Sequence, residues 1–148
     1  MADLRNEKLA DVLVNYSVAV KPGDKVLIQS SALAEPLLKE VYRCVLQAGG
    51  HPLVISNMPG MDEIFFRHAS ESQLKFVNPV QKMVIETYDV MINIMASANT
   101  KALTSVEPEK IQMNRRAGAE VMQTYMKRSA EGSLRWTVSL FPTQAFAQ

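Results

Sequence analysis

The sequence predicts a three-layer α/β fold around a parallel sheet of about four strands, with flavodoxin-like or Rossmann-like winding. Four short apolar segments, at residues 26–28, 53–55, 90–95 and 136–141, alternate with segments of helical periodicity. Turn-forming residues such as Pro22-Gly23 and Gly49-Gly50 separate them. Alternating strands and helices form βαβ units, which build parallel sheets with right-handed crossovers. The expected strand order is 2-1-3-4, with residues 26–28 and 90–94 as the central strands.

The amino-terminal half supplies two helices, two strands and a less regular stretch. A first helix over residues 3–18 would place one apolar face toward the core, formed by Leu9, Val12, Leu13 and Tyr16. The wholly apolar run at 26–28 is typical of a strand covered on both faces. Pro36 suits the first turn of a second helix, which Gly49-Gly50 ends before the strand at 53–55. Residues 57–60 open the irregular stretch, which includes a short helix through His68.

The carboxyl-terminal half repeats the alternation. Asn78-Pro79 starts a helix whose expected apolar face is Val80, Met83, Val84 and Tyr88. The strand at 90–95 follows, and residues 100–105 are expected to form a loop or a single turn. Glu107-Pro108-Glu109 marks the start of a helix running to about residue 128, because acidic residues favour a helix N-terminus. The last strand is expected at residues 136–141.

Composition narrows the class of protein. The chain has 148 residues, is 47% hydrophobic and carries a net charge of +1, so neither nucleic acid nor an anionic membrane is indicated as a partner. It has no apolar run of the roughly 18 residues that a membrane span requires, and its start lacks the apolar centre of a signal peptide. Cys44 is the only cysteine, which fits a reducing compartment. A cytoplasmic location is therefore expected.

Any small-molecule contact is expected at the carboxyl ends of the strands. In open α/β sheets a crevice forms there, where the winding reverses. The loops after the first and third strands would line it, so we expect cleft-lining side chains from Ser30, Ser31, Glu35, Ser97 and Asn99. For Glu35, at a helix start, a capping or dipole role is favoured over a substrate contact.

Familiar catalytic and cofactor motifs do not occur. The loop after the first strand reads Ser30-Ser-Ala-Leu-Ala34 and lacks the glycines of a dinucleotide site. The sequence has no phosphate-binding Gly-Lys-Ser/Thr loop, no nucleophile elbow and no receiver-type acidic cluster. No catalytic residue is predicted.

A metal centre is not predicted either. Catalytic zinc or cobalt sites take three or more His, Asp, Glu or Cys ligands. His51 and His68 are the only histidines and are interpreted as strand-edge and surface residues, while Cys44 is interpreted as a small buried hydrophobe. Four methionines are interpreted as core residues rather than a binding surface: Met83, Met91, Met95 and Met122.

Several motifs occur in the order found in one enzyme family. They are VKPGDKVLI at residues 20–28, LAEPL at 33–37, QAGG at 47–50, and a Trp136 strand leading into Pro142-Thr143. Their collinear order resembles the first domain of the thermophilic-type metallo-aminopeptidases, the family of aminopeptidases T and S. Phe146 stands where an aromatic residue, often Trp, is usual in that family.

The resemblance implies a cytoplasmic, dimeric exopeptidase that removes N-terminal amino acids from peptides. In this family two divalent metal ions activate water and polarise the scissile carbonyl, and their ligands lie in a second, larger domain. The first domain packs over the active-site face of the second. We therefore expect residues 1–148 to be the N-terminal domain, inactive alone, without its catalytic C-terminal domain. At that contact we expect apolar groups such as Phe141 and Phe146.

Two other functional classes stay open at this point. One is a free-standing flavodoxin-like module that binds a small ligand in the crevice. The other is an interaction or scaffold domain, because no residue pattern requires a ligand. A reading frame that continues beyond codon 148 with clustered Glu, His and Asp would favour the enzyme, and a stop codon would favour the module.

Overall fold

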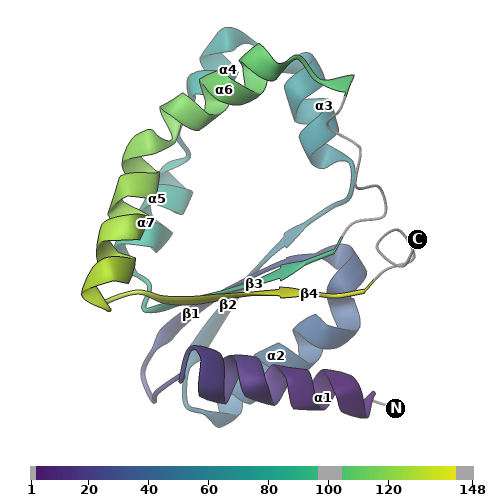
Figure 1. Ribbon diagram of the computed structural model, residues 1–148, viewed down its shortest axis with the longest axis vertical. Helices are drawn as coiled ribbons and strands as arrows, with labels where there is room; N and C mark the ends of the chain where they lie inside the picture. The colour runs from purple at the N-terminus through teal and green to yellow at the C-terminus, as the bar shows by residue number, and fades with distance from the viewer. Residues whose placement is uncertain (1–2, 97–104, 143–148) are drawn as a thin grey trace.

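The computed structural model describes residues 3–96 and 105–142, and its centre is a four-stranded, all-parallel sheet (Figure 1). The strands are β1 (Lys25–Ser31), β2 (His51–Asn57), β3 (Val90–Met95) and β4 (Arg135–Leu140). Their order is β2-β1-β3-β4, with β1 and β3 at the centre. The predicted fold class and strand order are confirmed. Because β1 and β2 pair in register over seven residues, both extend beyond their apolar centres.

One face of the sheet is covered along its length by amino-terminal helices (Figure 1). These are α1 (Leu4–Asp11), the π-helical turn η1 (Val12–Ser17) and α2 (Glu35–Gln47). The main core lies here, where Val26, Ile28 and Ile92 of the central strands pack against the helices. Phe141, just after β4, is half-buried against the same core. Among the described helices, none combines the length and apolarity that crossing a membrane requires.

The buried face of the first helical segment differs from the predicted one. Val12 and Tyr16 are exposed, Tyr16 by 81%, while Ala10, Leu13 and Val14 are buried. The two candidate stripes are adjacent and share Leu13, so periodicity alone does not separate them. The segment buries the stripe that carries Ala10, whose small side chain permits close approach of a neighbouring helix.

The described helices cover the opposite face of the sheet only over its amino-terminal half (Figure 1). Helices α5 (Pro79–Thr87) and α7 (Ala119–Glu131) lie there, and Val84, Ile85 and Leu134 pack on Leu27 and Met91. Helices α3 (Met61–His68), α4 (Glu71–Lys75) and α6 (Pro108–Ala117) arch away from the sheet (Figure 1). They share a small core of their own, formed by Phe66, Leu74 and Val106.

Two helix predictions need correction. The helix expected from residue 107 to about 128 is divided at Gly118, whose φ of −86° and ψ of 6° leave the helical region. Helix α4 was not predicted, although Ser70 and Gln73 form a capping box at its start. Five residues are too few for a periodicity signal, so only the cap could have indicated it.

Several side chains predicted to face the core are exposed. On α5, Val84 and Ile85 are buried, whereas Val80 and Met83 are exposed. Of the four methionines interpreted as core, only Met91 is buried, and Met83, Met95 and Met122 are each more than half exposed. Helix α5 buries only Val84 and Ile85, and α7 buries none of its residues fully. Met95 is the last residue of β3 and lies beyond the part of the sheet that these helices cover (Figure 1).

Candidate functional site

The predicted cleft residues of β1 are engaged in local structure. Ser30 is 1% exposed, and its hydroxyl donates to the carbonyl of Ser31 at 2.9 Å. Ser31 Oγ accepts from the backbone N–H of Leu33 at 3.2 Å and caps the 3-10 turn η2 (Ala32–Ala34). Both hydroxyls therefore help to fix the β1–α2 connection.

Glu35 stands at the start of α2, as predicted, and forms an exposed ion pair with Lys39 at 2.7 Å. The hydrogen bond from Lys39, followed by its positive charge, lowers the pKa of the Glu35 carboxyl. A carboxylate in the first turn also complements the helix dipole. Ser30, Ser31 and Glu35 do share the carboxyl-terminal edge of the sheet. Ser97 and Asn99 lie outside the described residues, so a shared cleft stays a prediction.

A second group of side chains, not predicted from the sequence, lies on the half of the sheet that α5 and α7 leave uncovered. Gln29 of β1 and Asn93 of β3 are partners in register, and each is partly buried. Ile55 of β2 and Val138 of β4 continue the same row on either side. In the sequence, this group is indicated by an amide residue that interrupts each of the two apolar central strands. Parallel strands that are covered on both faces are near-continuously apolar, so such an interruption suggests incomplete cover.

Charged groups concentrate at the opposite, amino-terminal edge of the strands. Asp24 pairs with Arg135, and its Oδ2 also accepts from the backbone N–H of Lys21 at 2.8 Å. Asp89 accepts from the N–H of Lys25 at 2.8 Å. These contacts join the starts of β1, β3 and β4, which gives them a structural role.

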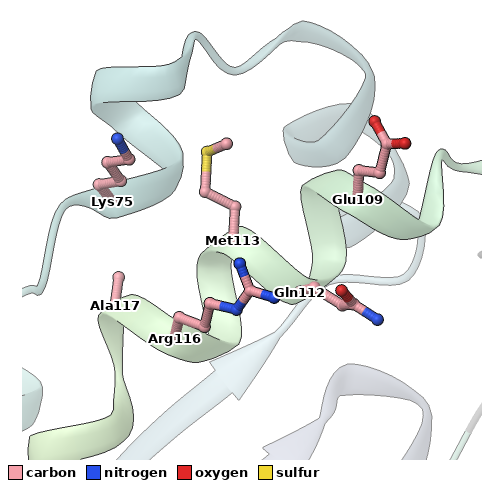
Figure 2. A pocket seen from close by; sticks show the side chains of 6 residues that line it. All are labelled: Lys75, Glu109, Gln112, Met113, Arg116 and Ala117. Atoms are coloured by element: carbon pink, nitrogen blue, oxygen red, sulfur yellow. The ribbon is translucent and has the colours of Figure 1, made fainter.

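A shallow hollow beside α4 and α6 carries mixed charge. It is lined by Lys75, Glu109, Gln112, Met113, Arg116 and Ala117. Figure 2 shows the acidic side chain of Glu109 directed away from the guanidinium of Arg116. Lys75 is paired with Glu71 at 2.7 Å. The hollow lacks the convergent polar groups of a small-molecule site.

The residues present do not fit a metal centre. Among residues 3–96 and 105–142, no group of three His, Cys, Asp or Glu side chains is placed to hold an ion. His51 begins β2 and His68 ends α3, and both are exposed. Cys44 is buried in the main core, and burial raises the pKa of its thiol, which disfavours the thiolate that a metal needs.

The fold and these contacts define a doubly wound α/β domain with one helical layer complete and the other partial. Comparison with known proteins identifies its family. The model of the thermophilic metalloproteases (M29) matches residues 3–148. This chain belongs to that family.

Two relatives illustrate the relationship. Aminopeptidase 2 of Geobacillus stearothermophilus is 22% identical over 147 residues, which are 96% of this chain and 35% of that protein. The solved structure of wild-type AmpT from Thermus thermophilus superposes with a TM-score of 0.76 at 19% identity, covering 94% of this chain and 36% of that one. The chain thus spans about a third of the length of the relatives it matches.

Proposed function

We propose that this chain is the N-terminal domain of a metal-dependent aminopeptidase, and that the catalytic metal centre is held by residues outside these 148. The observation that carries the proposal is the family match over residues 3–148, combined with coverage of only 35% of Aminopeptidase 2. A region that accounts for a third of a relative, and whose described residues contain no group fit to hold a metal ion, is suited to a supporting role in catalysis.

The supply of ligands supports the division of labour between domains. The sequence contains two histidines and one cysteine, and in the structure His51, His68 and Cys44 lie on three different elements. In this proposal the domain binds its own C-terminal domain and shapes access of peptide substrates to the metal centre. The cytoplasmic location and the homo-oligomeric state belong to the same proposal.

The test is elemental analysis and turnover by the purified 148-residue chain. After incubation with Zn²⁺, Co²⁺ or Mn²⁺ and gel filtration, we expect the chain to retain less than roughly one tenth of an equivalent of metal per chain. Retention this low is expected of a chain without a multidentate metal site. We also expect no release of leucine from leucinamide. One tightly bound ion per chain, or turnover that a chelator abolishes, would place the catalytic centre within these residues and reject the proposal.

A further inference from the structure

Strand β4 forms one edge of the sheet, and its sequence lacks the features that block further pairing. From Trp136 to Leu140 it reads Trp-Thr-Val-Ser-Leu, with no charged residue and no proline. The other edge strand, β2, does carry such a feature. The N–H of His51 donates to the carbonyl of Asp24 at the start of β1, so the nitrogen of the next residue, Pro52, faces the free edge of β2. Proline at that position prevents pairing, whereas β4 can accept a further strand.

The backbone groups on the free edge of β4 follow from the strand pairing. The N–H of Arg135 donates to the carbonyl of Asp89, on the β3 side. Successive N–H groups of a strand point in opposite directions, so those of Trp136 and Val138 point away from β3. Within residues 3–96 and 105–142, β3 is the only strand that pairs with β4. The outward N–H and C=O groups are therefore placed to pair with a further strand.

Beside this edge, helix α7 has two flanks in different environments. One flank, with Val121 and Thr124, lines a hollow together with α5. The other is turned toward β4, because Ser129 on it accepts a hydrogen bond from the indole N–H of Trp136 at 2.8 Å. The ring of Tyr125, between the two flanks, lies 6.2 Å from that of Trp136.

The β4-side flank of α7 is uncharged although it is exposed. Helical spacing places on it Ala119, Met122, Met126 and Ala130. Met122 is 57% exposed and Met126 is 62% exposed. An amphipathic helix turns its charged side chains to water and its apolar side chains to a neighbour. This flank therefore has the composition of a surface that another helix covers.

The winding of the sheet specifies where a following helix would lie. The step from β1 to β2 carries α2 on one face, and the step from β3 to β4, in the opposite direction, carries α7 on the other face (Figure 1). Right-handed crossovers require this change of face. A right-handed step from β4 to a strand beyond it would continue the β3-to-β4 direction, so its helix would lie on the α7 face beside the β4-side flank. One helix–strand unit would thus complete both the edge and the flank.

We propose that the polypeptide following residue 148 in the longer protein supplies this unit: a helix that packs on Met122 and Met126, and a fifth parallel strand that pairs with β4. The inference rests on the proposed function, under which this chain is about a third of an enzyme of the length of Aminopeptidase 2. The remaining two-thirds readily contains such a unit, since a strand–helix–strand motif needs only roughly 30 residues. Strands that are consecutive in sequence are also usually neighbours in a sheet.

Amide hydrogen exchange, followed at single residues in the wild-type proteins, tests the strand addition. In the 148-residue chain we expect the amides of Thr137 and Ser139, which point toward β3, to be protected. Those of Trp136 and Val138 should exchange rapidly. In the longer protein the exchange of the Trp136 and Val138 amides should slow by roughly a hundredfold or more, as for amides inside a sheet.

The substitution Met122→Glu tests the helix contact. Gln123→Glu is the matched control, because it adds the same charge at the next, exposed position of α7, outside the β4-side flank. In the 148-residue chain both variants should melt within roughly 1 °C of wild type, since both sites are exposed. In the longer protein only Met122→Glu should lower the melting temperature, by roughly 5 °C or more, because its carboxylate would be buried without a partner.

Several outcomes would overturn the proposal. One is equally fast exchange of the Trp136 and Val138 amides in the two proteins, and another is equal melting of the Met122 and Gln123 variants of the longer protein. Protection of these amides already in the 148-residue chain would also overturn it. Protection that grows with protein concentration would assign the edge to a second copy of the chain, and protection independent of concentration would assign it to residues within the 148.

Turnover of the longer protein separates this proposal from the proposed function. A longer protein that releases leucine from leucinamide but leaves the Trp136 and Val138 amides unprotected would reject only the strand addition. Protected amides in a longer protein without metal-dependent turnover would reject only the proposed function.

Discussion

Arg128 is predicted to hold the α5–α7 layer on the sheet. Its Nη1 donates to the carbonyls of Ile85 and Tyr88, each at 2.7 Å, and its Nη2 donates to the carbonyl of Ser133 at 3.1 Å. Ile85 lies in the last turn of α5, where a cation also complements the helix dipole. One guanidinium thus joins the end of α5, the approach to β3 and the connection from α7 to β4.

Replacing Arg128 with Met keeps much of the aliphatic stem and removes all three hydrogen bonds. Hydrogen bonds to charged groups contribute about 1.5–3 kcal/mol each, but the side chain is only partly buried, so water replaces part of the loss. We expect the free energy of unfolding to fall by about 3 kcal/mol. With a urea m-value of about 2 kcal/mol per molar, the midpoint would move by about 1.5 M.

Equilibrium urea unfolding followed by far-ultraviolet circular dichroism measures this shift. Arg115→Met is the matched control, because Arg115 is exposed on α6, and it should change stability by less than about 0.5 kcal/mol. A urea midpoint for the Arg128 variant within roughly 0.3 M of wild type would refute the structural role given to the guanidinium. A shift of that size corresponds to the change of about 0.5 kcal/mol that an exposed substitution can cause.

Three substitutions and one measurement of thiol reactivity test other parts of the fold. Gly50→Ala should destabilise the protein by about 1–3 kcal/mol, because the added Cβ would lie 2.9 Å from Val20 and 3.0 Å from Val45. Gly118→Ala should be neutral or stabilising by up to about 1 kcal/mol, because no atom lies nearer than 3.8 Å to the added Cβ. Thermal melts in which the Gly118 variant is less stable than the Gly50 variant would contradict the packing described for Gly50. Ser70→Ala should cost about 1 kcal/mol through loss of the α4 capping box, and an unchanged urea midpoint would contradict it. Cys44 should react with a thiol reagent at pH 8 far more slowly in the native chain than in guanidinium chloride. The reason is that burial raises the pKa of its thiol in the folded state and so leaves less thiolate. Equal reaction rates in the two conditions would mean that the thiol is accessible in the native chain.

The sheet could be predicted because its signal is local. Runs such as Val26–Leu27–Ile28 are short, wholly apolar and bounded by turn residues, and the crossover rules then leave few possible strand orders. Helix faces were less predictable, because the choice between stripes depends on the partner. Tyr16 belongs to an acceptable helical stripe, yet the stripe with Ala10 packs on α2.

The candidate site was predictable in part. The edge that carries Ser31 and Glu35 follows from the geometry of parallel strands, but their engagement in a turn and an ion pair depends on rotamers that the sequence does not specify. The row of Gln29 and Asn93 was missed because each amide looks like a single irregularity in its own strand. Only the register, which pairs the two, shows that they form one feature.

The central claim is that the catalytic centre of this M29 family member lies outside residues 1–148. The most direct measurement compares two proteins from the same gene: the 148-residue chain, and the product of the reading frame continued beyond codon 148, both assayed for leucine release from leucinamide with Co²⁺. We expect the frame to continue, the longer protein to be active with bound metal, and the 148-residue chain to be inactive. Metal-dependent turnover by the 148-residue chain, or a stop codon after codon 148, would contradict it.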